Sequence, residues 1–213
     1  MDPLQPVRLV QHGSVCFAHE DVTVYVDPYC IDTAPHDADV IIITHAHADH
    51  YSPADIAKVR RDDTCYVTTA EIADTLAETF GMDDCYLIEV NCETPTVYLE
   101  CGVGVTPVAA YNQNHPIDRG FGAVLQFAGV TYYLSGDTDV LAEDVKCDVL
   151  FVCCDGIYNM RSFQTEIPKA VHAMDIKPGL VVPYHCGEPG MEACAGRLCA
   201  ALTAAGIPCR QWK

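Results

Sequence analysis

The chain has 213 residues, of which 50% are hydrophobic, so it is long enough to bury a full core, and we expect a single domain over residues 1–213. Its 30 acidic residues outnumber its 12 basic residues, which gives a formal net charge of −18. This charge repels the phosphates of nucleic acid and the surface of anionic membranes, so we expect neither as a partner. No segment reaches the roughly 20 consecutive apolar residues of a membrane span.

The cysteine content is high, with 13 residues, and in a short secreted protein it would indicate disulfides. This chain is longer, and Met1–Pro6 has neither the basic nor the apolar segment of a leader peptide. We therefore expect a cytoplasmic protein whose thiols are reduced and mostly buried as small hydrophobic side chains. Cys186 and the adjacent pair Cys153 and Cys154 are the thiols closest to candidate chemistry.

Apolar segments near the N-terminus, separated by turn residues, predict a meander of three short strands. These strands span residues 7–10, 14–18 and 22–26. The apolar run Val40–Ile43 predicts a buried strand. Ser52 suits a helix N-cap and Pro53 the first helical position, which predicts a helix from residue 53 to about residue 60. Residues 44–50 therefore lie between the carboxyl end of a strand and the amino end of a helix.

The rest of the chain alternates apolar strands with amphipathic helices. Strands are predicted over residues 65–67, 86–90, 96–101, 103–110, 122–127, 131–134, 149–152, 180–182 and 207–211. Helices are predicted over residues 69–80, 165–174 and 191–205. Two β-rich halves, each accompanied by helices, indicate an α/β fold in which two sheets lie between outer helices, a four-layer αββα sandwich.

The segment Thr44–His50 contains three histidines and an aspartate within six residues. His45 and His47 point the same way on an extended backbone, so that both can bind one divalent ion. Asp49 and His50 can hold a second ion close by, as in the two-metal sites of hydrolytic enzymes. The alternative is a polar loop that caps the strand, but the density of metal-binding side chains favours a metal site.

Three further side chains of the same kind follow the ends of predicted strands: His115, Asp137 and His185. Loops at one end of a sheet converge in space, so these side chains can reach residues 45–50. Each has a simpler alternative. His115 would be a solvated loop histidine, Asp137 the cap of a helix that begins near Val140, and His185 a core histidine.

Together, the H-x-H-x-D-H segment, His115, the Ser-Gly-Asp-Thr sequence at residues 135–138 and His185 resemble the metallo-β-lactamase superfamily of metal-dependent hydrolases over essentially the whole chain. Asp27 and Pro28 match the first motif of that superfamily. Residues 11–14, Gln-His-Gly-Ser, are similar to the Gly-His-Ala-Ser start of the branch that includes L-ascorbate-6-phosphate lactonase, with two of the four residues replaced. Residues 156–160 also look like a feature of this branch.

The resemblance implies a metallo-β-lactamase fold with two metal ions. It places His45, His47 and His115 on one ion, Asp49, His50 and His185 on the other, and Asp137 between them. Asp27 is expected to orient the ligands from outside. Zinc and manganese suit these ligands, and iron is a further choice. The ions activate water for attack on a small ester, lactone or phosphodiester, which can be anionic because the ions reverse the local field.

Other side chains are candidates for orienting the nucleophile, stabilising charge or transferring a proton during the reaction. Asp49 can orient the attacking hydroxide, whereas Tyr158, Arg119 and His12 can stabilise developing charge or protonate the leaving group. Each of these three has a simpler alternative. Tyr158 would be a half-buried aromatic side chain, Arg119 a surface cation and His12 a histidine of a turn.

Three other functions compete with a small-molecule hydrolase. An RNA-processing nuclease of the same superfamily needs a basic groove, which the net charge disfavours. An iron redox centre resembling that of flavodiiron proteins comes with an appended flavin domain and a carboxylate-rich ligand pattern, which differs from the pattern here. A non-catalytic metal-binding protein normally has a closed site of four ligands, and this chain offers seven.

Overall fold

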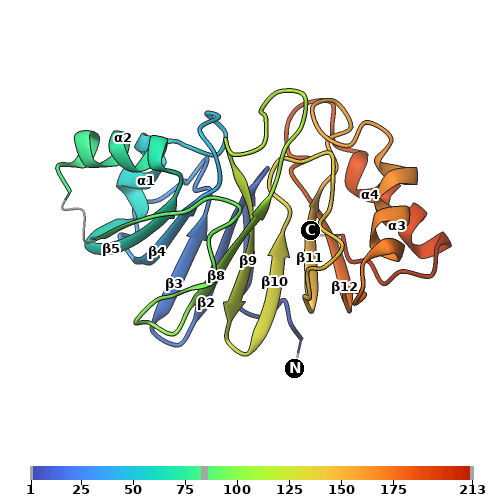
Figure 1. Ribbon diagram of the computed structural model, residues 1–213, viewed down its shortest axis with the longest axis horizontal. Helices are drawn as coiled ribbons and strands as arrows, with labels where there is room; N and C mark the ends of the chain where they lie inside the picture. The colour runs from blue at the N-terminus through green and yellow to red at the C-terminus, as the bar shows by residue number, and fades with distance from the viewer. Residues whose placement is uncertain (1, 83–85, 212–213) are drawn as a thin grey trace. The chain divides into compact units, whose positions relative to one another are not determined.

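The computed structural model describes residues 2–82 and 86–211. Within these residues the backbone forms two six-stranded sheets and four helices (Figure 1). The chain divides into two compact units, residues 1–91 and residues 92–213. Each unit contains one sheet and two of the described helices.

The sheet of the first unit follows chain order and changes from antiparallel to parallel pairing. Its strands are β1 (Val7–Gln11), β2 (Ser14–His19), β3 (Val22–Val26), β4 (Ala38–Ile43), β5 (Arg60–Thr68) and β6 (Leu87–Glu89). Strands β1 to β3 form the predicted antiparallel meander, and β3 to β6 pair in parallel. The helix α1 (Pro53–Val59) connects β4 to β5, and α2 (Ala70–Phe80) connects β5 to β6, as is usual between parallel strands.

The core of the first unit lies between the sheet and its two helices. Ile56 of α1 and Ile72 of α2 pack in one cluster with Ile41 and Tyr25 of the sheet, so both helices cover the same face (Figure 1). All four residues of the run Val40–Ile43 are fully buried, which explains why a strand in a parallel sheet has a continuous apolar sequence.

Local sequence signals set the bounds of these helices. Ser52 caps α1, because its Oγ accepts a hydrogen bond of 3.3 Å from the backbone N–H of Asp55, and Pro53 occupies the first helical position. Gly81 ends α2 in the left-handed conformation with a φ of 62°, which glycine adopts without a steric cost. The predicted helices at these two places are confirmed.

The second unit repeats this pattern, with antiparallel strands followed by parallel ones. Its strands are β7 (Val97–Tyr98), β8 (Gly104–Ala109), β9 (Phe121–Phe127), β10 (Val130–Leu134), β11 (Val149–Cys153) and β12 (Leu180–Tyr184). Strands β7 to β10 pair antiparallel, and β10 to β12 pair in parallel. The helix α3 (Phe163–Ala173) connects β11 to β12, and α4 (Cys194–Ala204) packs on α3 and β12 (Figure 1).

Two local predictions are wrong, and one alternative to a metal ligand is excluded. Residues 207–211 form no strand of their own, and only Cys209 makes an isolated bridge, to Val181. No helix begins near Val140 in the part of the chain that the structure describes, so Asp137 is not a helix cap. Cys199 and Cys209 form a disulfide, in contrast to the expectation of reduced thiols.

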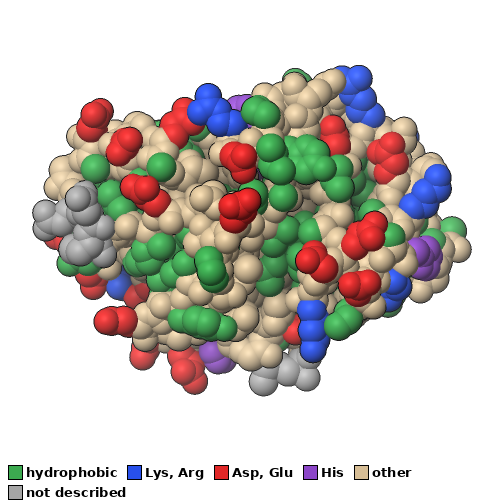
Figure 2. Space-filling view, viewed as in Figure 1, with side chains coloured by type: hydrophobic (Ala, Val, Ile, Leu, Met, Phe, Trp, Pro, Cys, Tyr) green, Lys and Arg blue, Asp and Glu red, His purple; other side chains and the backbone are tan. Residues whose placement is uncertain are grey.

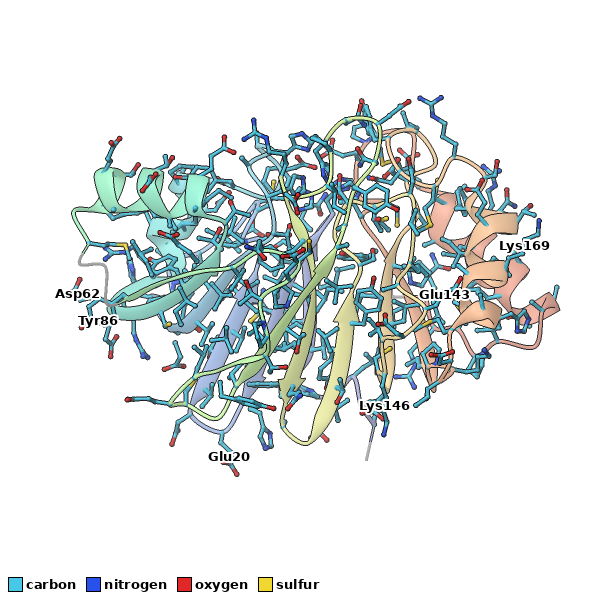
Figure 3. All side chains as sticks on the ribbon, in the orientation of Figure 1. Glu20, Asp62, Tyr86, Glu143, Lys146 and Lys169 are labelled. Atoms are coloured by element: carbon cyan, nitrogen blue, oxygen red, sulfur yellow. A yellow bond between two sulfur atoms is a disulfide. The ribbon has the colours of Figure 1, made fainter. Side chains whose placement is uncertain are left out.

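Charged side chains lie on the outside of each unit. Figure 3 shows Glu20 and Asp62 of the first unit and Lys169 of the second pointing away from the sheets. The face visible in Figure 2 carries more acidic than basic side chains, in line with the net charge of −18. None of the helices within the described residues is long and apolar enough to cross a membrane.

The parallel strands determine where polar side chains leave each sheet. In the first unit Asp27 follows β3 and Thr44 follows β4, and these two strands are parallel neighbours. In the second unit Asp137, Asp155 and His185 follow β10, β11 and β12, which are also parallel neighbours. Within each unit, the residues that follow these strands therefore lie along one edge of the sheet.

We predict that shortening a core side chain of β4 destabilises the protein. Ile41 is fully buried among residues of the sheet, α1 and α2, so Ile41→Ala should lower the free energy of unfolding by about 2–5 kcal/mol. Ile176 is 48% exposed and serves as the control, because Ile176→Ala should change the free energy by less than about 0.5 kcal/mol. Urea denaturation of both variants measures the difference, and equal losses would contradict this account of the core.

Candidate metal centre

The first unit brings together the residues that we call the histidine cluster: His12, Asp27, Thr44, His45, His47, Asp49 and His50. His45 is buried and His47 is exposed, and Nε2 of His45 lies 2.9 Å from Nδ1 of His47. Two imidazole nitrogens this close must share either a proton or a cation. Metal to nitrogen bonds of about 2.1 Å at angles between 90° and the tetrahedral value separate two ligand nitrogens by about 3.0–3.4 Å. The observed pair is close to that range.

Asp27 is the buried carboxylate of the histidine cluster. Its Oδ1 accepts a hydrogen bond of 2.7 Å from the backbone N–H of Thr44. Its Oδ2 accepts one from the Thr44 hydroxyl and one from Nδ1 of His50, each at 2.7 Å. Asp27 itself has a φ of 47°, a left-handed conformation that aspartate adopts more readily than most residues. These contacts hold Thr44 and the ring of His50 in place.

The contacts of Asp27 determine which nitrogen of each neighbouring histidine carries the proton. The Thr44 hydroxyl donates its single proton in the hydrogen bond to Asp27, so Oγ1 of Thr44 can only accept a hydrogen bond from the N–H at Nδ1 of His45, at 3.0 Å. Nδ1 of His50 donates directly to Asp27. Both rings therefore present the lone pair of Nε2, which is the form that binds a metal. This relay through Thr44 was not predicted, because the sequence does not show that Asp27 and Thr44 meet.

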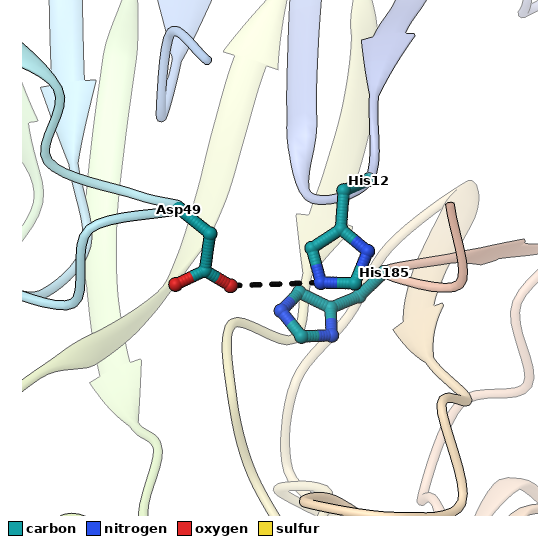
Figure 4. A group of neighbouring side chains, drawn as sticks. All are labelled: His12, Asp49 and His185. Carbon is teal, nitrogen blue, oxygen red and sulfur yellow. Dashed lines mark ion pairs between the residues drawn. The ribbon is translucent and has the colours of Figure 1, made fainter. Parts of the chain in front are cut away.

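Asp49 lies between two histidines of the cluster. Its Oδ2 is 3.5 Å from Nε2 of His12 and 3.5 Å from Nε2 of His50. Figure 4 shows the Asp49 carboxylate facing the ring of His12. His12 occupies the turn between β1 and β2, is buried, and has a φ of 52°, which is uncommon for a residue other than glycine. The turn thus holds this imidazole next to Asp49.

The second unit has its own group, which we call the aspartate cluster: Asn112, His115, Asp137, Asp155, Asn159 and His185. The ring of His185 is buried between two carboxylates. Its Nε2 lies 3.0 Å from Oδ1 of Asp137, and its Nδ1 lies 3.2 Å from Oδ2 of Asp155. His185 and Asp137, which follow different strands, are therefore neighbours.

Asp155 was missed by the sequence analysis, although it follows β11 as Asp137 follows β10. Its Oδ1 accepts hydrogen bonds from the backbone N–H groups of Ile157, Tyr158 and Asn159 at 2.6–3.1 Å. Burial by itself raises the pKa of Asp155, but the hydrogen bonds from His185, Asn159 and the backbone outweigh burial and lower the pKa to about 2. Asp155 is therefore ionised at neutral pH and orients His185 as Asp27 orients His50.

A buried amide connects the remaining members of the aspartate cluster. Nδ2 of Asn159 donates to Oδ2 of Asp137 at 3.0 Å and to Oδ2 of Asp155 at 2.8 Å. Its Oδ1 accepts a hydrogen bond from Nδ2 of Asn112, and Oδ1 of Asn112 accepts one of 3.0 Å from the backbone N–H of His115. His115 is buried and is positioned by the same network that orients Asp137. The sequence analysis did not single out Asn112, so its part in this network was also missed.

Two other candidates from the sequence have exposed side chains, although the backbone N–H of Tyr158 donates to Asp155. Tyr158 is 55% exposed, and Arg119 is exposed as well, so neither is a buried part of the cluster. Burial raises the pKa of the Cys153 thiol to about 12, so this group is protonated at neutral pH and is a poor metal ligand. A groove of about 630 Å³ in the second unit, lined by residues of β8 to β10 and the loop after β10, contains none of the predicted site residues.

We predict that the Thr44 hydroxyl supports metal binding without touching the metal. Thr44→Val keeps the shape of the side chain but removes the acceptor for Nδ1 of His45, and losses of outer partners typically weaken metal affinity by about 10–100-fold. Competition with a chelator measures the affinity for Zn²⁺. Thr75→Val is the matched control, because the Thr75 hydroxyl bonds only to a carbonyl of its own helix at the surface. Equal affinities in both variants would contradict the relay.

Comparisons with known proteins agree with this chemistry. A profile of the Beta-lactamase superfamily domain matches residues 6–185. A UPF0173 metal-dependent hydrolase of Salinibacter ruber is 28% identical over 196 residues, which cover 82% of this chain and 81% of the relative. A UPF0173 metal-dependent hydrolase of Thermococcus kodakarensis is 31% identical over 160 residues, 70% of this chain and 67% of the relative.

The fold is shared with solved structures as well. That of Igni18, a metallo hydrolase from Ignicoccus hospitalis, superimposes with a TM-score of 0.76 at 21% identity and covers 97% of this chain and 94% of its own. The predicted fold class is thus confirmed, whereas the similarity to the lactonase branch stays a prediction. The chain belongs to the metallo-β-lactamase superfamily and is one of its metal-dependent hydrolases.

Proposed function

We propose that this protein hydrolyses a small ester, lactone or phosphodiester and uses two divalent metal ions to do so. The observation that carries the proposal is the arrangement around Asp27. Its contacts place the proton of His45 and of His50 on Nδ1, so that Nε2 of each ring has a lone pair that can bind a metal. A histidine that served only to fill the core would need no such control of its proton. In the second unit, the contact between Asp155 and Nδ1 of His185 supports the same proposal.

The proposed ligands are those named in the sequence analysis. His45, His47 and His115 would hold the first ion, Asp49, His50 and His185 the second, and Asp137 both. The donor atoms are imidazole nitrogens and carboxylate oxygens, without a thiolate, and these favour zinc or manganese, with iron as the further choice. When bound, two such ions lower the pKa of a water molecule and polarise the oxygen of the scissile group.

The side chains of the histidine cluster have distinct parts in this reaction. Asp49 is partly exposed and can accept a proton from the attacking water. His12 lies 3.5 Å from the same carboxylate, so it can exchange a proton with Asp49 and pass one to the leaving group. Asp27 keeps the rings of His45 and His50 in place during this transfer. Tyr158 is a further candidate to stabilise the negative charge that develops on the substrate.

We further propose a small-molecule substrate and a single folding domain. The net charge of −18 disfavours a nucleic-acid substrate, and this supports the small-molecule hydrolase over a nuclease of the same superfamily. A cytoplasmic location and placement in the lactonase branch remain predictions from the sequence. A non-catalytic metal-binding protein is the other alternative, and the two experiments below separate it from the enzyme.

The first experiment counts metal ions. Protein purified without chelator and then saturated with Zn²⁺ or Mn²⁺ should hold two ions per chain by elemental analysis, because seven ligands exceed what one ion of these metals can coordinate. His115→Ala should reduce the number of ions bound per chain, or the affinity for one of the two ions. His172→Ala, which removes an exposed histidine of α3, should leave both ions in place. A count of one ion in the saturated wild-type protein would contradict the proposed ligand set.

The second experiment separates catalysis from metal storage. Asp49→Asn keeps the size of the side chain and an oxygen ligand but removes the charge that accepts the proton. We expect the variant to retain the fold and at least one ion, yet to lose at least about a hundredfold in turnover, roughly 2.7 kcal/mol in the barrier. Asp62→Asn, at an exposed position of β5, is the control. Wild-type turnover with both ions bound would exclude a catalytic part for Asp49.

A further inference from the structure

Exposed hydrophobic side chains are concentrated on the loops that contain the aspartate cluster. We call this set the apolar rim: Tyr111, Ile117, Val140, Ile157 and Tyr158, with exposed fractions from 37% to 55%. Among the described residues only Tyr98 and Ile176 are other large hydrophobic side chains with comparable exposure. Figure 2 shows hydrophobic side chains gathered over these loops, above β9 and β10 in the orientation of Figure 1.

The loops of the apolar rim are bonded to one another. The backbone N–H of Asp139 donates to the carbonyl of Tyr111 at 2.9 Å, and the hydroxyl of Thr138 bonds to the backbone of both Tyr111 and Val140. The backbone N–H of Met160 donates to Oδ1 of Asp139 at 2.7 Å. The loops after β8, β10 and β11 therefore form one connected, preformed surface.

The apolar rim is continuous with the proposed metal ligands. Oδ1 of Asp155 accepts hydrogen bonds from the backbone N–H groups of Ile157 and Tyr158, at 2.8 Å and 2.6 Å. Oδ2 of the same carboxylate lies 3.2 Å from Nδ1 of His185. One buried side chain thus fixes both a proposed ligand and two residues of the rim.

We propose that the apolar rim binds a hydrocarbon substituent of the substrate, so that the substrate is a neutral ester or lactone with a chain of several carbons. This inference rests on the proposed hydrolase function. Contiguous exposed apolar side chains on fixed loops are typical of ligand-binding surfaces. The net charge of −18 favours a neutral group over an anionic one for the part of the substrate that lies outside the metal centre.

The test compares p-nitrophenyl acetate, butyrate and octanoate as substrates of the metal-loaded protein. For the wild-type protein we expect kcat/KM to rise with chain length, by up to about fourfold for each methylene that becomes buried. Ile157→Asp should lower the octanoate-to-acetate ratio of kcat/KM at least tenfold. Ile176→Asp is the matched control, because Ile176 is 48% exposed and Ile157 is 47% exposed, and this variant should keep the wild-type ratio. Equal rates for all three esters, or equal effects of the two variants, would overturn the proposal.

A binding measurement separates the rim from the chemistry. The neutral fluorescent probe N-phenyl-1-naphthylamine should bind the wild-type protein and Ile176→Asp alike, and Ile157→Asp at least tenfold more weakly. This result without hydrolysis of any ester would support the rim while the proposed function fails. If Ile157→Asp does not fold, Ile157→Ala replaces it with the same expected direction. Unchanged probe binding, together with sedimentation that shows dimers in the wild-type protein and monomers in Ile157→Asp, would assign the rim to contact between two copies and overturn the proposal.

Discussion

The carboxylate of Asp27 is the group on which the histidine cluster of the first unit depends. It accepts hydrogen bonds from a backbone amide, a hydroxyl and an imidazole, all at 2.7 Å, and it is only 2% exposed. A buried carboxylate without such partners would be costly, so these groups are fixed in space by the need to satisfy it. The contacts connect the end of β3 to the segment after β4, and they set the protonated nitrogen of His45 and His50.

The second unit uses the same arrangement at the end of a different parallel strand. Asp155 follows β11, accepts backbone hydrogen bonds from the next turn, and contacts Nδ1 of His185. In both units an apolar strand ends at an aspartate that holds the loop with its carboxylate and orients an imidazole. The buried sheets supply rigidity, and the strand ends supply the polar side chains.

The sequence predicts those parts of the fold that short segments determine. The run Val40–Ile43, the Ser52 and Pro53 cap and Gly81 each have a local physical cause, and the structure places the expected elements there. The strand predicted at residues 207–211 fails because a strand needs a neighbour along its length, and this segment forms a single bridge, which joins Val181 to Cys209. Its disulfide to Cys199 also depends on how α4 packs, which spacing alone does not show.

The residues of the candidate site also divide into those that the sequence shows and those that only the fold brings together. The ligand types in Thr44–His50 are visible because they are adjacent in the sequence. Asn112 and Asn159, by contrast, are 47 residues apart and meet only in the fold. Asp155 could have been found by the rule that located Asp137 and His185, since it too follows a buried strand. The relay through Thr44 could not, because it depends on a hydroxyl whose partner comes from another strand.

We propose that buried carboxylates fix His45 and His50 with the proton on Nδ1, the form that binds metal. Long-range ¹H–¹⁵N NMR of the metal-free protein, with ¹⁵N-labelled histidine, measures this directly because protonated and unprotonated ring nitrogens differ strongly in chemical shift. We predict that His45 and His50 carry their proton on Nδ1 at neutral pH. Protonation of either ring on Nε2 would contradict the account, because the nitrogen proposed to bind the metal would then be a donor.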